Sequence, residues 1–189
     1  MKYLLLVAAF LLLASGVAYW RMCACGKQVA PVSGGYAKEE WPAAYKLVRD
    51  KFPEVRQLTT AQLDDWLKDK TKPQPLLLDA RATQEYAVSR LPNAQPAADE
   101  TQALAALAQK AKDAPVVVYC SIGYRSSALA QKLKARGFTN VQNLEGSIFK
   151  WANEARALQR DSLSVNVVHP FDERWGRLLE RARWSFAAH

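Results

Sequence analysis

Cysteine and histidine are scarce in this 189-residue chain, and their scarcity narrows the chemistry that it can support. Three cysteines and two histidines are too few for a disulfide framework, and at most one disulfide could form. Cys23 and Cys25 lie too close in sequence for an easy bridge between them. The sequence also lacks the Cys/His spacing of zinc fingers and the Gly-aromatic signature of RNA-binding modules. We expect no metal, no cofactor and no nucleic-acid partner.

Acidic residues are outnumbered by basic ones, 18 to 26, which leaves a formal net charge of +8. Such a balance suits small anionic substrates, a nucleic acid or an anionic membrane surface, and it does not choose among them. Half of the residues are hydrophobic and 23% are charged, which excludes a disordered chain. No internal repeat is visible, and the length fits one domain of ordinary size with appendages.

A single long apolar run lies near the N-terminus, at residues 3–20 (YLLLVAAFLLLASGVAYW). As a helix it would extend roughly 27 Å, near the lower limit for a membrane span. Residues 1–20 could form an uncleaved anchor with Tyr19 and Trp20 at the interface, or a signal peptide cleaved near Ala18. A buried N-terminal helix is the third interpretation. We expect the domain to be membrane-anchored through residues 3–20 and periplasmic or extracytoplasmic, or else secreted after cleavage.

Composition divides the remaining chain into three segments. Residues 21–40 form a linker, because Pro31, Gly34 and Gly35 interrupt any regular pattern. Residues 41–155 form the domain, and residues 156–189 form a C-terminal helical extension.

Within the domain, strand-like and helix-like segments alternate along the chain. Short apolar runs predict buried strands, and apolar positions at helical spacing predict helices between them. This alternation predicts an α/β fold with a mainly parallel central sheet and helices on both faces. We expect strands at 55–58, 75–79, 115–119 and 141–144, and helices at 41–52, 60–67, 83–87, 102–112, 126–136 and 148–158.

The C-terminal extension predicts one further helix, from about Glu173 to Phe186. Its apolar residues fall on one face and its arginines on another. Docking of the apolar face on the domain is one interpretation, and contact of the arginines with an anionic membrane surface is the other. The apolar face comprises Trp175, Leu178, Leu179, Ala182 and Phe186, and the basic face comprises Arg174, Arg177 and Arg181.

The most informative stretch is Pro115–Ser126, where an apolar run ends at Cys120 and a tight loop precedes a helix. Open α/β folds place their chemistry at the carboxyl ends of their strands. Backbone N–H groups of such a loop, with the positive end of the following helix, would favour the nucleophilic thiolate of Cys120. An inert buried cysteine is the alternative, and the presence of Gly123 and Arg125 in the same loop argues against it.

From about Trp41 to Ala155 the chain resembles a rhodanese domain, the sulfurtransferase module. Its loop Cys120–Arg125 is similar to the Cys-x-x-Gly-x-Arg loop of that family. The chain departs from the family pattern at Arg90, Asn93 and Ser147, where histidine, glycine and glycine are usual. The other segments that carry the resemblance are Leu78–Arg81 (Asp-x-Arg), Glu85–Ala94 (Glu-Phe/Tyr … His-Ile-Pro-Gly-Ala) and Val141–Trp151 (Leu-x-Gly-Gly … Trp).

The resemblance implies a sulfurtransferase with Cys120 as its catalytic residue. The thiolate would take the outer sulfur of a small anionic donor such as thiosulfate and pass it to a thiol, cyanide or protein acceptor. Arg125 would either bind the donor anion or brace the loop, and Arg81 would belong to a buried ion pair. A relay in which Cys23 or Cys25 accepts the sulfur is a further hypothesis. The residues expected to bind substrate are Ser121, Ile122, Gly123, Tyr124, Arg125 and Ser126.

Two other functions remain open. Rhodanese-like phosphatases and arsenate reductases use a Cys-x5-Arg loop, whereas Cys120 and Arg125 are spaced as Cys-x4-Arg. The shorter loop should fit a single sulfur better than a tetrahedral phosphate. The other function is a non-catalytic binding or sensing module, although such rhodanese domains usually lack the cysteine.

Overall fold

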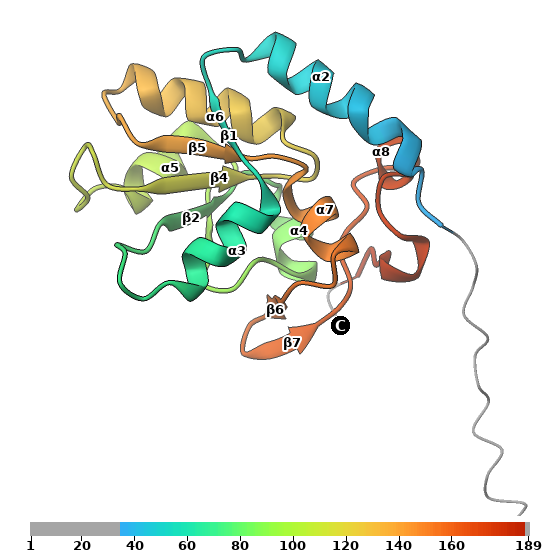
Figure 1. The fold of residues 1–189 in the computed structure, drawn as a ribbon. Helices are drawn as coiled ribbons and strands as arrows, with labels where there is room; N and C mark the ends of the chain where they lie inside the picture. Colours follow the sequence, from blue (N-terminus) through green and yellow to red (C-terminus); the bar gives the residue numbers. More distant parts are fainter. Residues whose placement is uncertain (1–34, 188–189) are drawn as a thin grey trace, which may run out of the picture. The chain divides into compact units, whose positions relative to one another are not determined.

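A five-stranded parallel sheet forms the centre of the computed structural model, which describes residues 35–187 (Figure 1). In spatial order its strands are β1 (Arg56–Leu58), β5 (Val141–Leu144), β4 (Val116–Tyr119), β2 (Leu76–Asp79) and β3 (Gln95–Pro96). Every pair in this sheet is parallel, as helical crossovers require. The central strand β4 is buried along its whole length, which explains its uninterrupted apolar sequence.

Helices cover both faces of the sheet, so the predicted α/β fold class is confirmed. Leu77 and Leu78, neighbours on β2, belong to two separate apolar clusters because side chains alternate along a strand. Leu77 shares its cluster with residues of α3 (Thr60–Lys68) and α7 (Ser147–Asn153). Leu78 shares the other with residues of α5 (Glu100–Ala106) and α6 (Tyr124–Ala135). Helix α2 (Trp41–Lys51), which follows the 3-10 turn η1 (Lys38–Glu40), contributes to both clusters, and α4 (Thr83–Val88) follows β2.

The predicted membrane anchor or signal peptide, the two cysteines of the linker and most of the linker itself lie outside the described residues. From residue 35 to residue 187, no helix combines the length and hydrophobicity needed to cross a membrane.

Two helices are shorter than the sequence predicted. Helix α5 is capped by the Asp99 side chain and ends at Ala106, not at Lys112. Residues 108–113 are exposed, so no apolar contact supports further helical turns. Helix α7 ends at Asn153, not at Leu158, because Ala155 takes a left-handed φ of 54°. The chain then enters an antiparallel hairpin of β6 (Leu158–Arg160) and β7 (Leu163–Val165).

The predicted helix from Glu173 to Phe186 is wrong. Only a four-residue helix, α8 (Glu173–Gly176), and a 3-10 turn, η2 (Arg181–Arg183), form there. Leu178 and Leu179 lie between them and are buried in the same core cluster as α3 and α7. A Cβ on Gly176 would lie 2.5 Å from the Trp184 ring, so the chain folds back on itself tightly. The extension thus packs on the domain through a compact turn rather than through a helix face.

Candidate active site

Cys120 follows the last residue of β4, at the carboxyl end of the sheet, and is buried. Its backbone N–H donates a hydrogen bond to Ser147 Oγ at 3.1 Å, and its Sγ accepts one from the N–H of Gly123 at 3.2 Å. Helix α6 begins one residue later, at Tyr124. The structure therefore has the strand, loop and helix that the sequence predicted around this thiol.

Gly123 occupies a backbone conformation that favours glycine, with a φ of 115°. A Cβ at this position would lie 3.1 Å from Asn143 Nδ2. Asn143 itself is fixed, because it accepts a hydrogen bond from Ser126 Oγ at 2.6 Å and donates one to Gln57 Oε1 at 2.6 Å. The loop and the first turn of α6 are thereby attached to β5 and β1.

The surroundings of Cys120 favour its thiolate. Burial by itself would raise the pKa of the thiol. The charge of Arg125 and the N–H groups of Ser126 and Gly123 outweigh burial, and the pKa falls below its ordinary value. A lowered pKa is the condition for a reactive cysteine at neutral pH.

Arg125 braces the loop, which is one of the two roles that the sequence left open. Its guanidinium donates two hydrogen bonds to the buried carboxylate of Glu85, at 2.7 and 2.8 Å, and a third to Ser121 Oγ at 3.0 Å. Ser121 Oγ in turn donates to Glu85 Oε1 at 3.2 Å. The Phe171 ring lies 4.7 Å from the guanidinium carbon. Glu85 belongs to a segment that carries the family resemblance, but sequence reasoning gave it no role, because its partner Arg125 lies 40 positions away.

A second ion pair holds the helix that carries Glu85. Asp79 and Arg81 pair at 2.6 Å, and both side chains are fully buried, so the expected buried pair is confirmed. Arg81 Nη2 also donates to the carbonyl oxygen of Ser89 at 2.6 Å, just beyond the end of α4. The pair therefore fixes α4 against the end of β2.

The departures from the family pattern have a structural explanation. Asn93 and Ser147 stand where glycine is usual, and both have a left-handed backbone, with φ values of 61° and 48°. Asparagine tolerates this conformation better than most residues. Ser147 uses its hydroxyl to accept from Cys120 and to donate to the carbonyl of Leu144 at 2.9 Å. Arg90 reaches the β6–β7 hairpin, where it pairs with Asp161 at 3.1 Å.

A cavity of about 310 Å³ opens over Cys120. Four of the predicted substrate-binding residues line it, whereas Gly123 and Ser126 do not; both lower the pKa of the Cys120 thiol through their N–H groups. Three apolar residues that line it, Leu47, Phe171 and Trp175, were not predicted as site residues. Phe171 and Trp175 come from the C-terminal extension, and no sequence motif connects them to the loop. The full lining is Leu47, Cys120, Ser121, Ile122, Tyr124, Arg125, Phe171 and Trp175.

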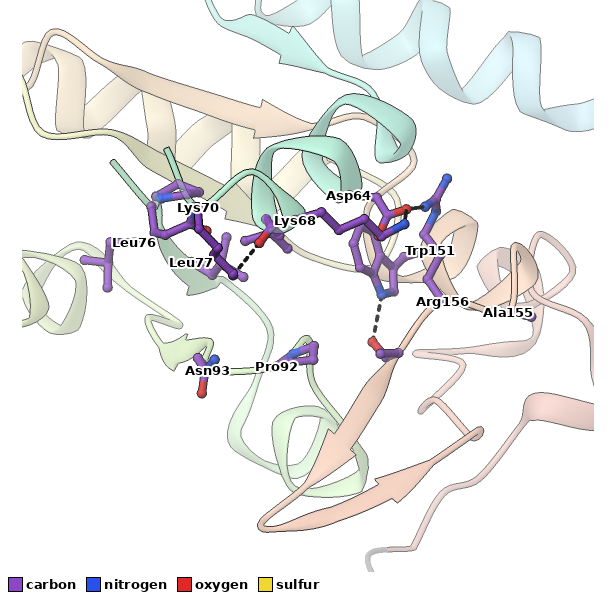
Figure 2. A pocket seen from close by; sticks show the side chains of 14 residues that line it. Asp64, Lys68, Lys70, Leu76, Leu77, Pro92, Asn93, Trp151, Ala155 and Arg156 are labelled. Carbon is purple, nitrogen blue, oxygen red and sulfur yellow. Dashed lines mark hydrogen bonds and ion pairs between the residues drawn. The ribbon is translucent and has the colours of Figure 1, made fainter. Parts of the chain in front are cut away.

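A larger cavity, of about 720 Å³, lies elsewhere and shares no lining residue with the first. Figure 2 shows Asp64, Lys68 and Arg156 at one side of it, with Trp151 beside them. Asp64 pairs with both cations, and no cysteine or histidine lines the cavity. Because Cys120 lines only the smaller of these two cavities, we take the smaller one as the candidate active site.

Comparisons with known proteins bear on the fold and the family of the chain. A sequence profile of the family described as Rhodanese-like domain matches residues 59–154. A curated protein named tRNA uridine(34) hydroxylase, from Escherichia fergusonii, is 31% identical over 137 residues, which cover 70% of this chain and 37% of that protein. The chain thus spans little more than a third of the length of that relative.

Two solved structures share the fold. Thiosulfate sulfurtransferase from Pseudomonas aeruginosa superposes with a TM-score of 0.53 at 18% identity, over 72% of this chain and 26% of that chain. A protein of unknown function from Rhodopseudomonas palustris, described as a possible tyrosine phosphatase, gives a TM-score of 0.51 at 19% identity, over 61% and 93%. At these identities the two likenesses concern the fold alone.

Proposed function

Because the chain belongs to the rhodanese-like domain family, we propose that it is a sulfurtransferase acting through a persulfide on Cys120. The observation that carries this proposal is a buried thiol of lowered pKa at the floor of an open cavity. Such a thiol can attack a sulfur atom without a separate general base.

The proposed reaction has two steps. The Cys120 thiolate attacks the outer sulfur of thiosulfate, the sulfur–sulfur bond of the donor breaks, and sulfite leaves with the bonding electron pair. A second nucleophile, such as cyanide or a thiolate, then attacks the outer sulfur of the persulfide and restores the Cys120 thiolate. Covalent catalysis of this kind gives ping-pong kinetics.

The loop would stabilise the charge that each step produces. The N–H of Gly123 donates to Sγ and that of Ser126 helps to lower the thiol pKa, and both would hold the anionic persulfide in its place. The remaining N–H groups of residues 121–125 would face the departing sulfite. The positive charge of Arg125 would stabilise both the persulfide and the departing sulfite. Its main contribution would be to hold the loop in place through its two hydrogen bonds to Glu85.

The test is a thiosulfate-to-cyanide transfer assay on the full chain. We expect thiocyanate to form with parallel lines in the double-reciprocal plots, and Cys120→Ser to form none. Mass spectrometry after thiosulfate treatment should find one added sulfur atom on the Cys120 peptide. If no sulfur is added there, a non-catalytic binding module becomes the better interpretation. Phosphate release from a phosphotyrosine analogue that is lost in Cys120→Ser would instead favour the phosphatase.

A second candidate reaction comes from the curated relatives, which are named for hydroxylation of tRNA uridine 34. The observation that favours it is the 31% identity over 70% of this chain. It would also add nucleic acid as a partner, against the sequence-based expectation. Loss of hydroxylated uridine 34 from the tRNA of cells without this protein, with restoration by the full chain, would support it.

The proposed location depends on the sequence alone. The uncharged run at 3–20 supports a domain held at a membrane, and the short, signal-like region before it supports a domain that faces out of the cytoplasm. Cell fractionation, with sequencing of the N-terminus of the recovered protein, would separate an anchor from a cleaved signal. Recovery in the cytoplasmic fraction would contradict both.

A further inference from the structure

Exposed apolar side chains gather around the thiol. Five large hydrophobic residues among residues 35–187 are exposed, and Leu47, Tyr124 and Phe171 line the Cys120 cavity, with exposed fractions of 43%, 38% and 44%. The other two, Leu163 and Phe186, do not line it. A concave apolar patch around a reactive group is typical of a binding site for an organic molecule.

The electrostatics of the cavity are weak by comparison. Arg125 is the only ionised lining side chain apart from the thiol itself. Its guanidinium already binds both oxygens of Glu85, and its central carbon lies 4.7 Å from the centre of the Phe171 ring. Apart from this one cation, which the thiosulfate donor would meet, the lining side chains are therefore uncharged and mostly apolar. The volume of about 310 Å³ also lies at the lower end of the range for sites that hold small organic ligands.

The apolar wall is held in place before any ligand binds. The Asp172 side chain caps α8 by accepting the N–H of Trp175 at 2.8 Å. The neighbouring Leu178 and Leu179 are buried in the core, and the carbonyl of Arg177 accepts the N–H of Ala37 at 2.8 Å. Figure 1 shows α8 beside the first turns of α2, the helix that carries Leu47. A preformed wall loses little entropy when a ligand binds.

We propose that this cavity binds the carbon-bearing part of an organic thiol acceptor whose substituent is apolar and uncharged, and that Leu47, Phe171 and Trp175 determine this specificity. The inference rests on the proposed function. In the step concerned, the thiolate R–S⁻ attacks the outer sulfur of the Cys120 persulfide. The new bond forms the anionic persulfide R–S–S⁻, the bond to Cys120 breaks, and Cys120 leaves as the thiolate. No net oxidation or reduction occurs, since one sulfur atom changes partners.

The test measures how fast a loaded protein loses its sulfur. The full chain is treated with thiosulfate, freed of donor, and mixed with 2-phenylethanethiol, 2-mercaptoethanol or cyanide in single-turnover experiments. Rates are compared per thiolate, so that differences in thiol pKa do not contribute. We expect 2-phenylethanethiol to react roughly tenfold faster than 2-mercaptoethanol, which is the size of preference that one apolar group confers in an apolar pocket.

Substitutions in the wall separate binding from chemistry. Leu47→Ala and Phe171→Ala should each reduce the preference for 2-phenylethanethiol several-fold, measured as a ratio to the cyanide rate of the same variant. Leu47 lies on α2 and takes no part in the Arg125–Glu85 ion pair, so its variant tests the wall and keeps both members of the brace. Leu163→Ala is the matched control, because Leu163 is 65% exposed and lies on β7, away from the cavity.

The outcomes distinguish the two proposals. Sulfur uptake is measured before any thiol is added, and its absence would overturn the sulfurtransferase and this inference together. Uptake followed by equal thiol rates would overturn the inference alone. A preference that both wall variants retain would also overturn it, since another surface would then bind the substituent.

Discussion

Glu85 holds Arg125 through two hydrogen bonds of 2.7 and 2.8 Å, although the two residues lie 40 positions apart in the sequence. The carboxylate is 2% exposed and the guanidinium 33%. This pair connects α4 to the first turn of α6 and keeps a positive charge near the Cys120 thiol. Fold stability and thiol reactivity therefore depend on the same contact.

The first prediction concerns that charge. Arg125→Gln should raise the pKa of the Cys120 thiol, because the charge that offsets its burial is removed. The rate of alkylation by iodoacetamide should then reach half of its maximum at a higher pH, and sulfur loading at neutral pH should fall several-fold. Arg136→Gln is the control: Arg136 pairs with Glu100 at 2.8 Å beyond the other end of α6. An unchanged alkylation profile in Arg125→Gln would refute the assigned role.

A second prediction concerns the hydroxyl beneath the loop. Ser147→Gly relieves a left-handed backbone but leaves the buried N–H of Cys120 without its acceptor. We expect the free energy of unfolding to fall by about 1 kcal/mol. Ser147→Ala keeps the strain and loses the same bond, so its loss should be about 2 kcal/mol. Urea denaturation measures both, and greater stability of the alanine variant would contradict this account.

The loop glycine provides a third prediction. Gly123→Ala places a Cβ 3.1 Å from Asn143 Nδ2 at a φ of 115°, so the loop must shift. We expect a loss of about 2 kcal/mol in unfolding free energy and at least tenfold slower sulfur loading. Gly137→Ala is the matched control, because Gly137 has a φ of 87° with open space around it. That variant should lose stability without any change in loading.

The fourth prediction concerns acid. Burial would raise the pKa of Glu85, but hydrogen bonds and charge from Arg125 lower it below its ordinary value of 4.5. A lowered pKa in the folded state gives stability that is complete above pH 4.5 and is lost as the pH falls through the folded value. Carboxylates titrate between about pH 5 and pH 3. Over this range the free energy of unfolding of Glu85→Gln should therefore vary less with pH than that of the unsubstituted protein. Equal slopes in the two proteins would contradict the prediction.

The sequence predicted four of the five strands of the sheet and the thiol loop, because these depend on local patterns; it missed the edge strand β3, which has two exposed residues. The run Val116–Tyr119 is apolar without alternation, as a strand covered on both faces must be, and Cys120 stands directly at its end. The buried partner of Arg81 was also predictable, since the two residues that pair lie close together in the sequence.

Contacts between distant segments could not be predicted. The spacing of Trp175, Leu178 and Leu179 indicated a helix face, but the burial of Leu178 and Leu179 in a turn gives more stability than helical hydrogen bonds on the surface would. The position of Phe171 over Arg125 follows from that turn. Glu85 was part of the family pattern, but its pairing with Arg125, 40 positions away, became evident only from the fold.

The family match ends at residue 154, whereas the cavity over Cys120 is completed by Phe171 and Trp175. The nucleophile and part of the wall of its cavity thus come from separate segments of the chain. Exchange of the coding sequence after residue 154 alone would leave Cys120 unchanged and give it a different set of substrates. A shortened domain that ends at residue 154 would keep the nucleophile but lose the part of the cavity wall that Phe171 and Trp175 form.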